Sequence, residues 1–231
     1  GNLIGGSFNN AVAEAKEIKN SVQNVRLLGN VNAEYSISDE LKLNIRMGAT
    51  QSYSARAKFK PMTPELLNTV AYGEDRTSSD FNWLTEYTLN YNKLIGKHLI
   101  TGVIGYTVQK DNTKSVYIYS DKFSNNLVPY LSATSGLITN GSTSFSEWSM
   151  VSYLARVNYN YNSKYYLTAS FRTDGSSRFG KDKKYGLFPS AAVAWRISDE
   201  AFLKDISQLS ELKLRGSYGV TGNNNIGNYD H

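Results

Sequence analysis

Between Val151 and Thr173 the chain alternates between apolar and polar side chains with a period of two. In the first half, one face is apolar or aromatic and consists of Val151, Tyr153, Ala155, Val157, Tyr159 and Tyr161. The other face, apart from Leu154, carries Ser152, Arg156, Asn158, Asn160 and Asn162. After a turn at 162–164 the alternation resumes, and both halves reach the about 9 to 11 residues that a bilayer-crossing strand needs. The pattern therefore predicts two strands of a transmembrane β-barrel.

The same period recurs at residues 24–50, 81–110 and 187–220, and each of these ranges predicts a further pair of strands. Short turns join the two strands within each of the pairs at residues 24–50, 81–110 and 147–173. We therefore expect an all-β fold, an antiparallel meander of about eight transmembrane strands that forms part of a larger barrel.

Longer connections rich in Ser, Asn, Asp, Gly and Lys are expected at residues 51–80, 110–146 and 174–186. Outer-membrane barrels keep short turns on the periplasmic side and long loops outside, so these three connections are assigned to the extracellular face. Residues 1–23 are expected to form another outer loop, with a short helix over residues 10–23.

Two local features modify this picture near the end of the chain. Ser198 to Leu203 resembles an N-capped helical turn that bridges the last two strands. Pro189 has no N–H to donate to a strand ladder, so a bulge or a strand end is expected there.

Composition agrees with a barrel without requiring one. No run approaches the roughly 18 apolar residues of a membrane-spanning helix, and the mean hydropathy is −0.42. The 17 Tyr, 9 Phe and 3 Trp suit the aromatic girdles of a barrel. With no Cys there is neither a disulfide framework nor a thiolate metal site. The net charge of +5 is not gathered into a basic cluster with stacking aromatics, so nucleic-acid binding is not expected.

The first residues, Gly1 to Gly6, contain neither a basic nor an apolar segment of a secretory signal. Because an exported protein needs such a signal, we expect the chain to be an internal piece of a longer precursor.

An ordered set of short motifs carries a family resemblance. They are Arg172-Thr173-Asp174-Gly175-Ser176-Ser177-Arg178-Phe179-Gly180, Phe188-Pro189-Ser190, Trp195-Arg196-Ile197-Ser198, Glu200-Ala201-Phe202, Leu212 to Gly219, and Thr221-Gly222-Asn223. In this order the set resembles SusC/RagA-type TonB-linked outer-membrane proteins, most densely over residues 151–229.

The resemblance implies a large barrel of about 22 strands whose lumen is filled by a plug. It also implies energy supply through TonB, a SusD-like surface lipoprotein that closes as a lid, and import of oligosaccharides or peptides. The location it implies is the outer membrane of a Gram-negative bacterium of the Bacteroidetes kind, in contact with membrane lipids. The chain shows no plug domain and no TonB box, so it resembles part of the barrel alone.

Asp174, with Arg172 and Arg178, is a candidate for binding a polar ligand at the outer rim. The alternative is a salt bridge that fixes the loop, because Gly175 and Gly180 suit a turn that needs positive φ.

Many cations fall on the polar phase of the strands, namely Arg26, Lys42, Arg46, Arg156, Arg172, Arg196, Lys213 and Arg215, against Glu34 and Glu86. Such a basic lumen could select anionic substrates. It could equally meet acidic residues of the plug or simply be solvated.

The aromatic residues suggest two roles. Tyr159, Tyr161, Tyr165 and Tyr166 lie beside a turn, where aromatics mark the membrane boundary. Stacking on sugar rings is better placed in or beside an outer loop, at Tyr117, Tyr119, Tyr130 and Trp148.

Catalysis has little support in the sequence. His98 and His231 lack metal-ligand spacing, and the acidic pairs Asp39-Glu40 and Asp199-Glu200 are explained by turn formation and N-capping. We expect no enzyme activity, no metal and no cofactor. Two alternatives to the importer segment remain: a self-contained small barrel acting as porin or adhesin, and a soluble β-rich glycan-binding module.

Overall fold

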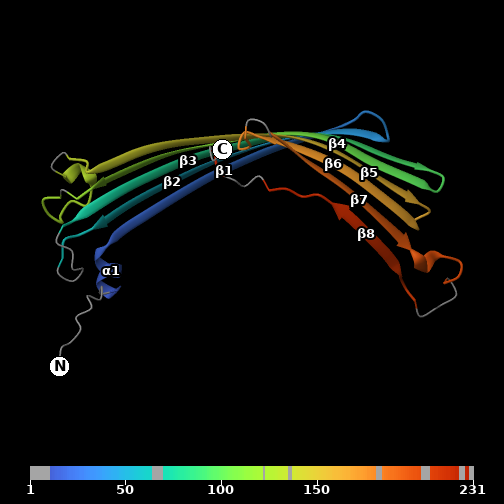
Figure 1. Ribbon diagram of the computed structural model, residues 1–231. Coiled ribbons are helices and arrows are strands. Elements are labelled where there is room, and N and C mark those ends of the chain that lie inside the picture. Colours follow the sequence, from blue (N-terminus) through green and yellow to red (C-terminus); the bar gives the residue numbers. More distant parts are fainter. Residues whose placement is uncertain are drawn as a thin grey trace, which may run out of the picture. The chain divides into compact units, whose positions relative to one another are not determined.

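The structure is a computed structural model that describes residues 11–63, 70–121, 123–134, 137–180, 184–203, 209–223 and 227–228. Over these residues eight antiparallel strands form one sheet in which every strand lies beside its neighbours in sequence (Figure 1). This confirms the predicted meander. None of the described helices is long and apolar enough to cross a membrane. The elements are α1 (Ala11–Glu17), β1 (Lys19–Ser36), β2 (Leu41–Lys60), β3 (Tyr72–Ile95), β4 (His98–Ser120), η2 (Leu131–Ala133), β5 (Asn140–Tyr161), β6 (Tyr165–Ser176), β7 (Tyr185–Arg196), η3 (Ile197–Asp199) and β8 (Lys213–Gly219).

The sheet has two faces that keep the predicted alternation. We call the face that carries Val157, Leu167 and Val193 the apolar face, and the opposite one the polar face. On the apolar face the ring of Tyr106 lies 6.2 Å from that of Tyr87 and 5.2 Å from that of Tyr153, so aromatic contacts link β3, β4 and β5. Such cross-strand pairs are the unit that stabilises a sheet.

No second layer covers the apolar face among the described residues. Val157, Leu167 and Val193 are 53%, 49% and 57% exposed. In the described part of the chain, the buried apolar side chains are Ala13, Phe59 and Ala71. An uncovered apolar sheet face of this extent is what a lipid environment requires, and a water-soluble module would leave it unprotected.

Four strands run farther than the sequence predicts. β2 continues to Lys60, β3 begins at Tyr72, β4 continues to Ser120 and β5 begins at Asn140. Much of the ranges 51–80 and 110–146, expected to be loops, is therefore strand, and this expectation was wrong. On β3 the signal is missing because residues 74–80 are polar on both faces, and a strand keeps its ladder of backbone hydrogen bonds without alternating in hydrophobicity. On β2 the alternation continues, with Tyr53, Ala55, Ala57 and Phe59 in phase with Ala49, so there the signal was present and was missed.

Polar contacts on the apolar side mark where this change occurs. Gln51 Nε2 donates to Ser79 Oγ at 3.0 Å, and Lys110 Nζ lies 3.0 Å from Glu147 Oε2. Gln51 and Lys110 follow in phase on the apolar residues Ala49 and Val108. Polar pairs therefore interrupt the apolar band at this level, while on β2 the same face continues with Tyr53, Ala55, Ala57 and Phe59.

The chain divides into two compact units at nearly the same positions. One consists of Gly1–Leu28, Thr50–Phe81 and Asn112–Ser146, and the other of Gly29–Ala49, Asn82–Asp111 and Glu147–His231. We call the first the loop-end unit, because it holds the long β2–β3 and β4–β5 connections. The second is the turn-end unit, because it holds the short turns and the apolar band.

Two helical expectations are confirmed only in part. α1 lies within residues 10–23, but β1 begins at Lys19, so the rest of that range is strand. Near Ser198 the chain forms the short 3-10 helix η3, whose capping residue is Arg196 without a side-chain cap bond. Ser198 is therefore not the N-cap, and the turn is closed instead by the Glu200 N–H, which donates to Ile197 O at 3.0 Å.

Pro189 lies inside β7, which neither ends nor bulges there, so the expected bulge or strand end was wrong. Pairing of β6 with β7 passes through Phe171 and Pro189 without an interruption in register. Pairing of β7 with β8 stops at Ser190 and Gly219, and beyond it the Val220 N–H donates to Pro189 O at 3.0 Å. Proline can accept this bond but cannot return one, which explains why the β7–β8 ladder ends there.

The β5–β6 turn requires unusual backbone angles. Asn162 and Ser163 have φ of 52° and 56°, and the Lys164 N–H donates to Tyr161 O at 3.0 Å. Asparagine tolerates this left-handed region better than most residues, so Asn162 suits the turn.

Gly175 is explained by close packing rather than by its φ. Gly96 is the glycine with positive φ among the described residues, and neither Gly175 nor Gly180 has a positive φ. The explanation of these two glycines by a turn that needs positive φ was therefore wrong. Gly175 pairs with Tyr185 across β6 and β7, and a Cβ at Gly175 would clash with the Tyr185 ring. The missing side chain is what lets the ring lie across β6.

We predict that Gly175→Ala lowers the free energy of unfolding by about 1 kcal/mol or more, because the Tyr185 ring must leave its place. Urea unfolding of the protein in lipid vesicles measures this. Gly216→Ala is the matched control, since its Cβ would meet only Val193 Cγ2 at 4.0 Å. Equal losses for the two variants, or an undiminished Gly175→Ala loss in a Tyr185→Ala background, would contradict the packing argument.

Candidate functional site

In the loop-end unit the polar face of β3 and β4 carries a ladder of side-chain contacts. Thr113 Oγ1 donates to Asp80 Oδ2 at 2.8 Å, and the hydroxyls of Ser78 and Ser115 lie 3.1 Å apart. Farther from the apolar band the Tyr117 hydroxyl donates to Glu74 Oε2 at 3.3 Å. This part of the chain therefore presents hydroxyl, carboxylate and phenol groups in a fixed order.

Cations lie over the aromatic rings of this ladder. The Arg76 guanidinium carbon is 5.1 Å from the centre of the Tyr117 ring, and Lys58 Nζ is 5.6 Å from that of Tyr72. The Tyr72 and Tyr119 rings lie 5.7 Å apart. Burial and the nearby Glu74 carboxylate raise the pKa of the Tyr117 hydroxyl, which keeps it a hydrogen-bond donor at neutral pH.

A cavity of about 600 Å³ lies in the same unit, beside this ladder. Its wall includes Lys58, Glu74 and Tyr130, a residue that is 68% exposed to solvent. Charged groups of both signs and one accessible ring are what a polar, ring-containing ligand could use.

The loop that carries Tyr130 is held in place at several points. The Met62 N–H donates to Asn126 Oδ1 at 2.9 Å, and Asn126 Nδ2 donates back to Met62 O at 2.8 Å. The Phe123 ring contacts Phe59 edge-on at 5.0 Å. Tyr130 is therefore presented from an anchored segment.

The four aromatic candidates from the sequence differ in their surroundings. Tyr117 and Tyr119 lie in β4 and Trp148 in β5, not in loops. Trp148 has one face covered by the Arg178 guanidinium, 4.6 Å from the ring centre. Of these four residues, Tyr130 is the most exposed to solvent.

Arg172 and Asp174 bind each other on the polar face of β6. Arg172 Nε donates to both carboxylate oxygens of Asp174 at 2.9 Å, and Arg172 Nη2 donates to Ser152 Oγ at 3.3 Å. Ser152 is 2% exposed. This arrangement ties β5 to β6, as the structural alternative expected, and it uses the groups that a ligand would need.

Arg178 is also engaged by the protein. Besides lying over Trp148, it donates from Nε to Asn228 Oδ1 at 2.6 Å. The Ser177 N–H donates to Ser149 O, and Ser177 Oγ accepts the Ser149 N–H, both at 2.9 Å. The turn after β6 is thus fastened to β5.

The remaining motif residues surround these contacts. Phe188 lies in β7, and a Cβ at Gly222, after β8, would clash with its ring. Ser170 and Ser190 share a hydroxyl contact of 2.6 Å. The motif positions are distributed as follows: Asp174, Gly175 and Ser176 end β6, Ser177, Arg178, Phe179 and Gly180 follow it, Phe188, Pro189, Ser190 and Trp195 lie in β7, and Gly222 and Asn223 follow β8.

The basic residues of the polar face fall into two groups. Lys42 lies 3.0 Å from Glu34, Arg46 lies 4.0 Å from Glu86, and Arg196 lies 3.5 Å from Asp199. By contrast, no carboxylate in the described ranges forms an ion pair with Arg26, Arg156, Lys213 or Arg215. The face is therefore balanced in some places and positive in others.

Aromatic side chains gather at the short turns, as predicted for a membrane boundary. The Tyr161, Tyr165 and Trp195 rings are stacked in sequence at 6.3 and 6.4 Å, and His98 lies 4.8 Å from Tyr161. Tyr166 is not in this row, because it faces the polar side below Lys213.

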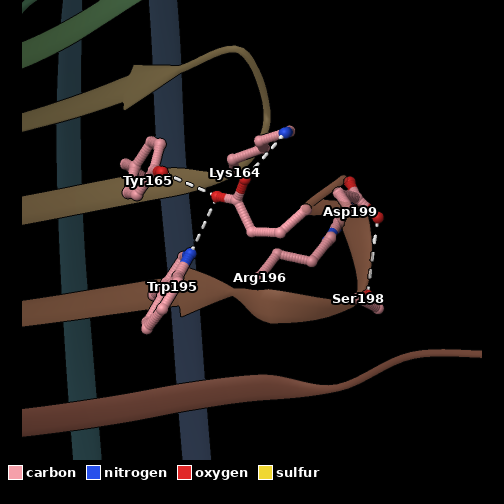
Figure 2. Close-up of polar contacts among 7 residues, drawn as sticks. Lys164, Tyr165, Trp195, Arg196, Ser198 and Asp199 are labelled. Carbon is pink, nitrogen blue, oxygen red and sulfur yellow. Dashed lines mark hydrogen bonds and ion pairs between the residues drawn. The ribbon is translucent and has the colours of Figure 1, made fainter. Parts of the chain in front are cut away.

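Glu200 joins this row to the turn after β7 (Figure 2). Its carboxylate accepts the Tyr165 hydroxyl at 2.6 Å, the Trp195 indole N–H at 3.1 Å and Lys164 Nζ at 3.2 Å. The Tyr165 bond, followed by those from Trp195 and Lys164, lowers the pKa of Glu200 from 4.5 to about 2. N-capping, the role expected from the sequence, does not describe this residue.

Several residues of the site had no signal in the sequence. Lys58, Tyr72 and Glu74 fall in a range expected to be loop, so their common face could not be recognised. Two partners of Glu200 are distant in sequence: Tyr165 is 35 residues away and Lys164 is 36 residues away. An exposed carboxylate next to an aromatic girdle could have suggested it, but only with the hairpin register known.

Comparison with known proteins gives close relatives over nearly the whole chain. No protein-family model matches it. It is 35% identical to TonB-dependent receptor P3 of Formosa agariphila, over 99% of this chain and 23% of that receptor. It is 53% identical to TonB-dependent receptor SusC of Bacteroides thetaiotaomicron over 34% of this chain and 8% of SusC. A structure of the RagAB peptide transporter matches with a TM-score of 0.86 at 25% identity, over 94% of this chain and 24% of that one. The chain thus spans about a quarter of the length of P3.

We predict that tryptophan fluorescence follows the protonation of Glu200. Because the folded-state pKa of about 2 lies below the usual 4.5, the contacts stabilise the fold fully above pH 4.5 and are lost as the pH falls through about 2. A fluorescence transition near that pH should be absent in Glu200→Gln. Asp199→Asn, which leaves the Trp195 bond intact, is the control and should keep the transition. The same transition in Glu200→Gln would rule out this assignment.

Proposed function

This chain is a barrel segment of a SusC/RagA-type TonB-dependent receptor, and we propose that it forms part of the wall and outer rim of an importer in the outer membrane of a Gram-negative bacterium. The observation that carries the proposal is the single sheet with an uncovered apolar face, in a chain similar to such receptors over 99% of its length. Its role in this proposal is mechanical and selective, not catalytic. The relatives are named as receptors and a transporter, which supports that view.

In this proposal the apolar face contacts membrane lipid and the polar face lines the lumen. The aromatic row at the short turns lies at the periplasmic boundary, where Tyr and Trp rings are favoured. The loop-end unit then lies outside the cell. Its strands continue beyond the apolar band, which suits a barrel that rises above the membrane surface.

The proposed cycle needs parts of the receptor other than this chain. A plug preceding the barrel would couple it to TonB, and a SusD-like lipoprotein would close over the outer rim. The relation to SusC and to the RagAB transporter supports these partners. The substrate class we propose is an oligosaccharide or a peptide, and the RagAB relative is a peptide transporter.

We assign first contact with substrate to the loop-end cavity beside Tyr130. Its accessible ring could stack on a sugar or a peptide side chain, while Lys58 and Glu74 offer polar contacts. Arg172, Asp174 and Arg178 are assigned a different role in the proposal. Arg172 and Asp174 already bind each other, and Arg178 binds Trp148 and Asn228. In the proposal these side chains therefore shape the rim without contacting substrate.

A self-contained porin or adhesin barrel fits less well. All 18 residues of β1 are exposed, and β1 and β8 are the outer strands of the described sheet. A closed barrel has no such edges, because its first and last strands pair. Neighbouring strands from the rest of a larger receptor would satisfy these edges.

The proposal is tested with the complete receptor in its native host. Uptake of fluorescent oligosaccharides and oligopeptides too large for porins should occur, should stop when TonB is deleted, and should require the co-expressed SusD-like lipoprotein. Uptake that continues without TonB would contradict the importer assignment.

In a binding titration of the transported ligand with the complete receptor, Tyr130→Ala should weaken binding about 2- to 10-fold, the effect of losing one stacking contact. Tyr130→Phe keeps the ring and should bind nearly as the unaltered receptor does. Tyr218→Ala removes a tyrosine in β8, outside the cavity, and serves as a control. Equal affinities for Tyr130→Ala and Tyr130→Phe would remove Tyr130 from the site.

A further inference from the structure

The polar face of β5 to β8 has cations that the described protein does not neutralise. Arg172 is paired with Asp174, and Arg196 lies near Asp199 and Glu211. Arg156, Lys213 and Arg215 have no ion pair with any carboxylate in the described ranges. Cations gathered on one wall of a narrow lumen raise the local concentration of anions.

One of these cations borders a defined hollow. A cavity of about 250 Å³ spans β6, β7 and β8, and we call it the notch; its lining includes Tyr166, Thr168, Ala192, Ala194, Arg215 and Ser217. Ala194 pairs with Tyr166 on one side and with Arg215 on the other. Because the side chain between them is only a methyl group, a guest can lie beside the guanidinium.

A second cation lies at the same place. Lys213 Nζ is 3.9 Å from the centre of the Tyr166 ring, so the ammonium is held by a cation–π contact. The Tyr166 hydroxyl donates to Ser163 O at 2.7 Å, which fixes the ring that carries it. Two positive groups two residues apart on β8 therefore lie at this place, Arg215 in the lining of the notch and Lys213 over the Tyr166 ring that also lines it, and they repel each other.

We propose that the notch binds a carboxylate from the lumen side, with Arg215 as the principal donor and Lys213 as the second positive charge. A guanidinium presents paired N–H groups whose geometry matches the two oxygens of a carboxylate. The carboxylate comes either from another part of the same receptor lying in the lumen or from an acidic ligand in transit. The inference rests on the proposed function in taking the polar face as the lumen wall.

The solvated-surface alternative explains the charges but not their setting. A charge that serves solubility alone needs no adjacent cavity, and longer side chains at Ala192 and Ala194 could have filled this one. Arg156 provides the contrast, because it is equally without an ion pair yet lines none of the notch. It is therefore the matched control residue.

The test uses the complete receptor in outer-membrane vesicles, with a single cysteine introduced by Ala194→Cys; these 231 residues contain no Cys. The measured quantity is the rate of modification by two thiol reagents of similar size, the anionic sulfonatoethyl and the cationic trimethylammonioethyl methanethiosulfonate. If the notch is open to solution, the anionic reagent should react about tenfold faster. That preference should disappear in Arg215→Gln/Lys213→Gln and persist in Arg156→Gln.

If a carboxylate of the receptor itself fills the notch, the cysteine should be closed to both reagents. It should then open in Arg215→Gln/Lys213→Gln but not in Arg156→Gln. Either pattern supports the proposal and identifies the source. Equal rates with both reagents, or closure that does not depend on Arg215 and Lys213, would overturn it.

A neighbouring position separates failure of this inference from failure of the proposed function. Leu167→Cys lies on the apolar face, between Tyr166 and Thr168 in sequence, and should react with neither polar reagent if that face contacts lipid. Rapid reaction at Leu167→Cys would contradict the barrel-wall assignment. A silent Leu167→Cys with equal rates at Ala194→Cys would remove only the notch.

Discussion

Backbone hydrogen bonding in an apolar environment is the constraint on which the rest of this structure depends. Inside a bilayer no water is present to satisfy an N–H or C=O group, so the strands must bond to one another along their whole length. The meander from β1 to β8 does this by pairing each strand with its neighbours in sequence. In the proposed barrel the apolar face needs no second layer, because lipid would take that place. The scarcity of buried apolar residues among those described follows directly, and so does the placement of polar residues on the opposite face.

The same ladder explains how the two ends of the strands come to differ. Beyond the level of Gln51 and Lys110 the strands continue and polar side chains also occur on the face that carries the apolar residues, although β2 still alternates there. The strands there carry groups such as Glu74 and Tyr117, which a ligand could meet on a rigid support. In the turn-end unit, Tyr165, Trp195 and Glu200 form an aromatic row joined by hydrogen bonds. In the proposed function the first unit supplies contacts with solutes and the second holds a fixed position at the membrane boundary.

How far the sequence predicts this structure depends on where water lies. Alternation identified all eight strands of the described sheet and the faces of Arg172 and Arg215, because one face meets an apolar medium. It did not identify the extensions of β2 to β5: residues 74–80 of β3 are polar on both faces and give no periodic signal, whereas β2 keeps alternating through Tyr53, Ala55, Ala57 and Phe59, a signal that the sequence offered and the prediction missed. Gly175 was correctly singled out but for the wrong reason, since the Tyr185 ring that excludes a Cβ comes from another strand. The roles of Glu200 and of the Arg178–Trp148 contact likewise depend on pairing across strands, which a single sequence does not display.

The central claim is that the two faces of these strands meet different media. A nitroxide label placed in turn at each position from Gly141 to Tyr161 of β5 in the complete receptor tests it most directly, by comparing relaxation by oxygen with relaxation by a water-soluble nickel complex. From Val151 to Tyr161 oxygen should dominate at odd positions and the nickel complex at even ones, and on the loop side of Ser149 the alternation should cease. Uniform accessibility from Val151 to Tyr161, or alternation of the opposite phase, would contradict the account.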